Sequence, residues 1–61
     1  MELKDGHKYI DRRGAVHTVY RRIGIISSHP FENETKTLKW ARSGRYAHSE
    51  DHPNDLVGEA S

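Results

Sequence analysis

Arginine side chains in or beside predicted turns are the groups in this chain best suited to binding. Each guanidinium presents a planar fork of donors that fits a phosphate or a carboxylate. Neighbouring aromatic rings offer flat faces on which a nucleic-acid base can stack. The alternative is that the arginines are only solvated and the aromatic rings lie in the core. The candidate binding residues are Arg12, Arg13, Arg21, Arg22, Phe31, Trp40, Arg42, Arg45 and Tyr46.

The five histidines do not have the spacing of a metal site. Only His48 and His52 lie close together in the sequence, and Pro53 argues against a helix that would align them. A zinc site needs three or four converging ligands. The sequence therefore predicts neither a metal nor a cofactor.

Serines and paired carboxylates occur, but not in a catalytic pattern. No serine stands in a nucleophile-elbow sequence. The carboxylate pairs, Glu32 with Glu34 and Glu50 with Asp51, fall in predicted loops. Catalysis needs a nucleophile, a base and an orienting group held in a pocket, and a domain this small rarely encloses one. We therefore expect that the protein is not an enzyme.

The formal net charge of +1 hides an uneven distribution along the chain. Residues 1–48 carry all ten basic side chains and five acidic ones, whereas residues 49–61 carry four acidic side chains and no basic one. A basic body attracts phosphates and acidic proteins. Two other interpretations stay open: the acidic end folds back and neutralises the body, or it imitates the phosphates of DNA.

The length of 61 residues allows one small domain, residues 1–61. No apolar run approaches the roughly 18 residues of a membrane span. Cysteine is absent, and the first residues lack the apolar core of a signal peptide. These features predict a cytoplasmic protein with no membrane partner. Because so short a chain buries little surface, a homo-oligomer is an additional expectation.

The elements that must position the candidate residues are short strands joined by turns. Strands are predicted over residues 7–11, 15–22, 23–26, 36–41, 45–48 and 55–58. Gly14 supplies a turn that makes the first two strands a hairpin, and the run 23–26 is either a third strand or a continuation with a bulge at Gly24. Residues 27–35 and 49–54 are predicted loops.

Five or six short strands with this spacing predict an all-β fold, either a small SH3-like barrel or a strongly bent antiparallel sheet. Phe31, next to Pro30 in a polar stretch, is either a core residue or an exposed anchor for a partner. The predicted core consists of Tyr9 or Ile10, Val16, Val19, Ile23, Ile25, Phe31, Leu38, Trp40, Tyr46, Leu56 and Val57.

The order of the motifs resembles a group of short bacteriophage and prophage proteins. The motifs are Gly6-x-x-Tyr9, Asp11-Arg12-x-Gly14, Pro30-Phe31, Trp40-x-x-x-Gly44-Arg45-Tyr46 and Pro53-x-Asp55-Leu56-Val57. The resemblance spans roughly residues 6–58, and His29 stands where the pattern more often has tyrosine. It implies a phage origin, and small phage proteins of this kind commonly block host machinery or sequester defence signals.

The residues and the resemblance together predict a non-enzymatic protein that inhibits or modulates a host factor by stoichiometric binding, such as a counter-defence protein. The expected contact surface is formed by the arginine-bearing turns and the Pro30-Phe31 loop. One alternative is binding of nucleic acid or a signalling nucleotide through the same arginines and aromatic rings. A second alternative is a small virion or assembly protein.

Overall fold

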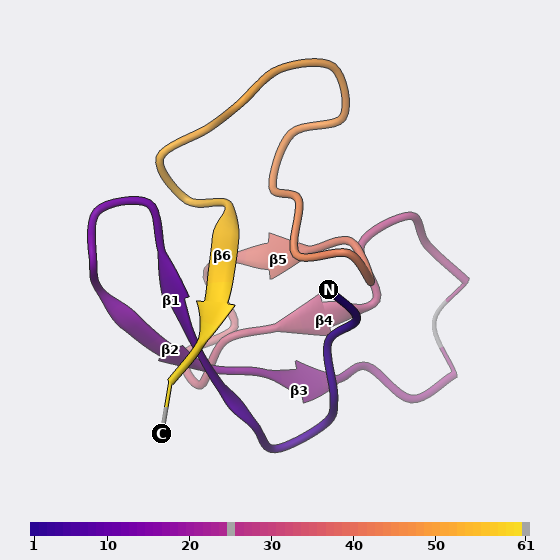
Figure 1. The fold of residues 1–61 in the computed structure, drawn as a ribbon. Helices are drawn as coiled ribbons and strands as arrows, with labels where there is room; N and C mark the ends of the chain where they lie inside the picture. Colours follow the sequence, from indigo (N-terminus) through magenta and orange to yellow (C-terminus); the bar gives the residue numbers. More distant parts are fainter. Residues whose placement is uncertain (25, 61) are drawn as a thin grey trace.

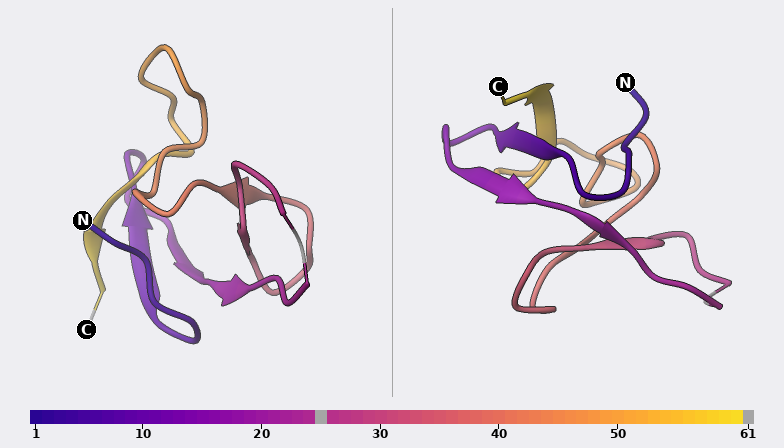
Figure 2. Two further views of the ribbon diagram at one scale, coloured as in Figure 1. Left: turned by 90° about the vertical axis from the view of Figure 1, so that its right-hand side faces the viewer. Right: turned by 90° about the horizontal axis from the view of Figure 1, so that it is seen from below.

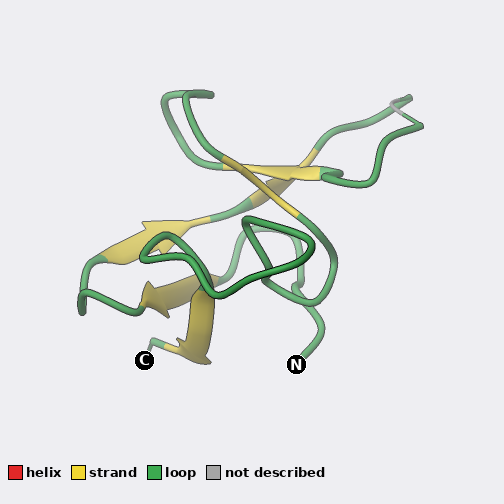
Figure 3. Ribbon diagram, turned by 90° about the horizontal axis from the view of Figure 1, so that it is seen from above, coloured by secondary structure: helices red, strands yellow, loops and turns green. Residues whose placement is uncertain are grey.

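The computed structural model describes residues 1–24 and 26–60, which form six short strands (Figure 1). The strands are β1 (Lys8–Asp11), β2 (Val16–Thr18), β3 (Tyr20–Arg21), β4 (Phe31–Glu32), β5 (Lys39–Trp40) and β6 (Leu56–Glu59). Figure 3 shows strands and loops only in this part of the chain, where no helix is long and apolar enough to cross a membrane. The all-β prediction is confirmed.

The strands form two three-stranded antiparallel sheets, and the described residues do not close into a barrel. The first sheet has the order β2-β1-β6, and the second has the order β3-β4-β5. The predicted hairpin is confirmed, because β1 pairs with β2 in the register Tyr9 opposite His17. The turn between them is held by Asp11, whose carboxylate accepts the backbone N–H groups of Arg13 and Ala15, both at 2.9 Å.

The single strand predicted over residues 15–22 is wrong, because the chain leaves the first sheet at Val19. The Val19 N–H donates to the His7 carbonyl at 3.0 Å, and its carbonyl accepts the Gly6 N–H at 2.7 Å. Beyond Val19 the chain continues as β3 and pairs with β4, as the right-hand view of Figure 2 shows. Val19 is fully buried at this junction. Burial of its apolar side chain stabilises the point at which the chain passes from the first sheet to the second.

The prediction for residues 23–35 also needs correction. Residues 23 and 24 form a turn instead of a strand, and Ile25 lies outside the described residues. Strand β4 lies within the stretch that was predicted to be a loop. Pairing with β3 on one side and β5 on the other creates this two-residue strand, which is too short to leave an alternating pattern in the sequence.

The strand predicted over residues 45–48 is wrong as well, because none of these residues is in a strand and residues 46–48 form bends. The Tyr46 N–H donates to the Asp55 carboxylate at 2.7 Å, so a side chain takes the place of a neighbouring strand. The strand predicted over residues 36–41 is confirmed only in part, as β5.

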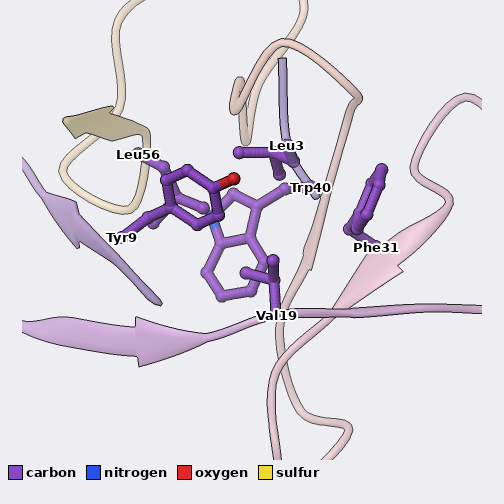
Figure 4. Packing of buried hydrophobic residues seen from close by; sticks show 6 residues of the cluster. All are labelled: Leu3, Tyr9, Val19, Phe31, Trp40 and Leu56. Atoms are coloured by element: carbon purple, nitrogen blue, oxygen red, sulfur yellow. The ribbon is translucent and has the colours of Figure 1, made fainter. Parts of the chain in front are cut away.

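The apolar core gathers around Trp40, as Figure 4 shows. The Trp40 side chain is fully buried, and its Nε1–H donates to the Asn54 carbonyl at 2.7 Å. Leu38 and Tyr46 pack against the cluster from positions that are partly exposed. The buried members are Leu3, Tyr9, Val19, Phe31, Trp40 and Leu56.

Three residues predicted to be in the core are exposed instead: Val16, Ile23 and Val57, with exposed fractions of 55%, 95% and 52%. Val16 pairs with the half-buried Ile10 across the first sheet. Both lie on the face opposite Tyr9, because neighbouring residues of a strand point to opposite faces.

Of the two residues at the Tyr9 or Ile10 position, Tyr9 is therefore the core residue. Ile25, which was also predicted in the core, lies outside the described residues. Leu3 was not predicted, because it precedes the first strand; its N–H donates to the Arg42 carbonyl at 2.8 Å, which holds it over the core.

Candidate interaction surface

Two of the candidate arginines face the chain's own acidic end. Arg12 Nε lies 3.2 Å from a carboxylate oxygen of Asp55, and Arg12 Nη2 lies 3.3 Å from Asp51 Oδ1. Arg45 Nη1 donates to the same Asp51 oxygen at 2.9 Å, and Arg45 Nη2 donates to the Glu50 carbonyl at 2.9 Å. The acidic segment therefore folds back onto the basic body, which was one of the alternatives for the charge distribution.

Arg13, the second arginine of the β1–β2 turn, is also held within the molecule. Its Nη2 lies 3.5 Å from Asp11 Oδ2 and donates to Asn54 Oδ1. An arginine that already has a carboxylate must give up this partner before it can bind a phosphate. The structure thus brings Arg12, Arg13 and Arg45 close to acceptors of the same chain.

Asp55 organises this part of the molecule, a role that the sequence analysis missed. Its side chain is buried, and it accepts the backbone N–H groups of Tyr46 at 2.7 Å and of His52 at 2.9 Å. Burial raises the pKa of Asp55, but these two hydrogen bonds and the one from Arg12 outweigh it and lower the pKa from 3.8 to about 2. The only signal in the sequence is an acidic residue directly before the apolar pair Leu56-Val57.

Asp11 is the second buried carboxylate, and it fixes the β1–β2 turn. Its Oδ2 accepts a hydrogen bond from His17 Nε2 at 2.8 Å, in addition to the two backbone groups of the turn. Burial raises the pKa of Asp11, whereas the hydrogen bonds from His17 and from the backbone lower it, and the net shift is downward. The His17 ring lies against Trp40, with 5.3 Å between the ring centroids.

The other three candidate arginines lie on different elements. Arg22 holds the base of the β3–β4 loop, because its N–H donates to the Pro30 carbonyl at 2.8 Å and its Nη1 donates to the His29 carbonyl at 3.2 Å. Arg21 is exposed in β3, and Arg42 is exposed in the turn after β5. The six arginines therefore do not converge on one site.

The aromatic candidates lie mostly in the core. Phe31 and Trp40 are directly paired across β4 and β5, so both point to the inner face of the second sheet. With exposed fractions of 5% and 0%, neither offers a free ring face, and the exposed-anchor alternative for Phe31 is wrong. Tyr46 is half-buried, and its ring lies 4.5 Å from the His52 ring, centroid to centroid. The accessible aromatic residue is Tyr20, exposed by 43%, which the sequence analysis did not single out.

His29 and His48 contact each other, and His29 also bonds to a backbone group. The rings of His29 and His48 meet edge to face with 4.8 Å between centroids, and His29 Nε2 donates to the Tyr46 carbonyl at 2.8 Å. Within residues 1–24 and 26–60, no three His, Asp or Glu side chains form a group that could hold a metal ion, and no pocket is found.

The β3–β4 loop carries the two most exposed large apolar side chains of the described residues. Ile23 is exposed by 95% and Ile26 by 104%, and we call this pair the apolar tip. The loop projects from the second sheet at the right-hand side of Figure 1. Because Arg22 bonds to Pro30 and His29, the base of the loop is fixed. The sequence suggested a buried strand here because an isolated apolar run cannot show whether a sheet covers it.

These placements change the predicted surface. The side chains of four arginines are held by acceptors of the chain, two aromatic rings are in the core, and two isoleucines outside the predicted site are exposed. No protein-family model, curated protein or solved structure matches this chain.

Proposed function

We propose that this protein is a non-enzymatic binding protein that inhibits or modulates a bacterial host factor by stoichiometric contact through the apolar tip. The exposure of Ile23 and Ile26 carries this proposal. Burying an isoleucine side chain that stood in water contributes roughly 1.5–3 kcal/mol. A partner that covers both side chains therefore gains a useful part of its binding free energy from two residues.

The fixed base of the loop also supports binding. Association costs free energy for ordering the groups that meet, and a preorganised loop reduces this cost. The backbone bond between Arg22 and Pro30 and the side-chain bond between Arg22 and the His29 carbonyl order the base before a partner arrives.

The resemblance of the motifs to short bacteriophage and prophage proteins supports a host protein as the partner, with the bacterial cytoplasm as the place of action. An SH3-like arrangement is the corresponding proposal for the fold. It is supported by the two small sheets and by the passage of one chain segment from the first sheet to the second at Val19.

Nucleic-acid or nucleotide binding has less support. Arg12 and Arg45 each have a carboxylate partner, and Trp40 lacks the free face that stacking requires. Virion assembly would require the apolar tip to bind another copy of the chain, and the experiment below distinguishes this outcome.

The test is affinity capture from a bacterial lysate followed by titration calorimetry with the purified captured protein. The wild type is compared with the double variant Ile23→Ser, Ile26→Ser and with Val57→Ser, which changes an apolar side chain that is about half exposed on β6. We expect stoichiometric binding by the wild type and by Val57→Ser, and a loss of affinity of at least about tenfold in the double variant. Unchanged binding by the double variant contradicts the proposal, as does capture of nucleic acid or of the chain itself alone.

A further inference from the structure

We propose that the partner presents a carboxylate at the rim of an apolar pocket, and that Arg21 pairs with this carboxylate while the apolar tip enters the pocket. This inference rests on the proposed function, because it concerns the partner of the same site. In this proposal, Arg21 makes the site specific for a partner with an acidic surface.

The segment of the sequence that carries the apolar tip is basic, although in the fold the carboxylates of Asp5 and Glu32 lie against the Arg21 N–H and the Arg22 side chain. Between Asp11 and Glu32 the sequence contains four arginines and no acidic residue. Two of these arginines, Arg12 and Arg13, belong to the β1–β2 turn, where carboxylates of the chain hold them. Of these four arginines, Arg21 and Arg22 are therefore the two that lie beside the apolar tip in the sequence.

Arg22 is engaged within the molecule. Its Nη1 donates to the His29 carbonyl, its Nε lies 3.7 Å from Glu32 Oε1, and its side chain is mostly covered, with 22% exposed. A partner that recruited the Arg22 guanidinium would have to break its hydrogen bond to the His29 carbonyl at the base of the loop. Arg22 therefore positions the apolar tip, and Arg21 is the arginine that can contact the partner.

The Arg21 side chain, unlike that of Arg22, is not engaged by a carboxylate of the described residues. It is exposed, and within residues 1–24 and 26–60 no carboxylate lies within salt-bridge distance of its guanidinium. The backbone N–H of Arg21 donates to Asp5 Oδ1 at 2.7 Å. Asp5 therefore binds the backbone of β3 and not the Arg21 guanidinium. Only one residue separates Arg21 from Ile23, so one partner surface can reach both.

A protein carboxylate suits this combination better than phosphates do. Tight binding to nucleic acid sums many phosphate contacts, and a single unpaired arginine with two isoleucines cannot supply them. An anionic membrane gains little from one basic residue, and stable attachment requires several. By contrast, one arginine paired with a carboxylate beside buried apolar side chains is a frequent centre of protein–protein interfaces.

The test uses four immobilised proteins over the same clarified bacterial lysate: the wild type, Ile23→Ser with Ile26→Ser, Arg21→Glu, and Arg42→Glu. Arg42 is the matched control because it is also exposed and likewise has no carboxylate within salt-bridge distance among the described residues. Quantitative mass spectrometry measures the retained protein. We expect Arg21→Glu to reduce retention about tenfold and Arg42→Glu to leave it unchanged. Replacing the paired acidic residue of the purified partner by arginine should restore binding to Arg21→Glu.

The two proposals fail in different ways. Retention by Arg21→Glu at the wild-type level, together with loss in the isoleucine variant, overturns the role of Arg21 and leaves the proposed function standing. Retention by both variants contradicts the proposed function. Retention of no protein by the wild type contradicts both proposals. Arg21-dependent binding of the wild type to phosphatidylglycerol vesicles or to a single-stranded oligonucleotide, without a retained protein, overturns the choice of a carboxylate.

Discussion

The Asp55 carboxylate lies 3.2 Å from Arg12 Nε, and this contact joins residues that are 43 positions apart in the chain. It connects the turn between β1 and β2 with the segment that enters β6. The same carboxylate receives the backbone N–H groups of Tyr46 and His52, so one buried side chain holds three separate segments together. A buried charge with this many donors stabilises the fold only while all of them remain in place.

Replacing Asp55 by asparagine should lower the free energy of unfolding by about 3 kcal/mol, because it leaves Arg12 and the two backbone donors without a charged acceptor. Urea denaturation measures the change. Asp51→Asn is the control, because the Asp51 side chain is 72% exposed and its pairs with Arg12 and Arg45 are screened by water. We expect Asp51→Asn to cost at most about 0.5 kcal/mol. Equal losses in the two variants would contradict the central role of Asp55.

The stability of the protein should depend on pH in the acid range. The pKa of Asp55 is lowered in the folded state, from 3.8 to about 2. Its contribution is therefore present in full above the unfolded pKa, falls as the pH drops from 3.8 toward 2, and amounts to about 2 kcal/mol. The lowered pKa of Asp11 adds to stability in the same direction.

Urea denaturation at a series of acid pH values measures this dependence. Asp55→Asn should show a shallower fall than the wild type, and the lowered pKa of Asp11 should contribute to the fall that remains. A wild-type stability that does not change through the acid range would contradict the hydrogen bonds assigned to both carboxylates.

Trp40 is the chain's single tryptophan, so its fluorescence reports on the core directly. Because the indole is fully buried, we expect a short emission wavelength and weak quenching by acrylamide in the folded protein, and a shift to longer wavelength on unfolding. Trp40→Phe should cost about 2 kcal/mol, since it leaves a small cavity and removes the donor to the Asn54 carbonyl. The control Tyr20→Phe changes an exposed ring and should stay within about 0.5 kcal/mol. Strong quenching of the folded wild type would contradict the burial of Trp40.

Gly44 and Gly14 provide a matched pair for testing a close approach. Both have positive φ, +92° and +86°, where a side chain is strained. A Cβ at Gly44 would also stand 2.9 Å from the Leu56 carbonyl oxygen, whereas at Gly14 it would meet nothing within 4 Å. Thermal unfolding should therefore show a loss of about 1 kcal/mol for Gly14→Ala and about 3 kcal/mol for Gly44→Ala. Equal losses would mean that only the backbone conformation matters at Gly44.

Some of the candidate site was predictable from the residues, and some was not. In the sequence, Arg21 and Arg22 are binding candidates because a guanidinium presents a planar fork of donors that fits a phosphate or a carboxylate. The sequence does not show that Arg22 is used inside the molecule, because the carbonyls of His29 and Pro30 reach Arg22 only where the chain returns to pair β4 with β3. Ile23 is predicted in the core because an apolar run does not reveal whether another element covers it.

The sequence by itself determined the features that depend on near neighbours. The β1–β2 hairpin follows from the turn at Gly14 and the apolar and β-branched residues on both sides of it, and the burial of Trp40 with the part-burial of Leu38 follows from their alternation. In both cases the signal in the sequence is local, although the residues that cover Trp40 come from distant segments of the chain.

Only the tertiary structure decided the features that join distant segments. The break at Val19, the neutralisation of Arg12 by Asp55 and the exposure of the apolar tip all depend on which surfaces meet after folding. A charged side chain looks the same in the sequence whether its partner is water, a residue 43 positions away or another protein. The free energy of such a contact is set by burial and geometry, which exist only once the chain has folded.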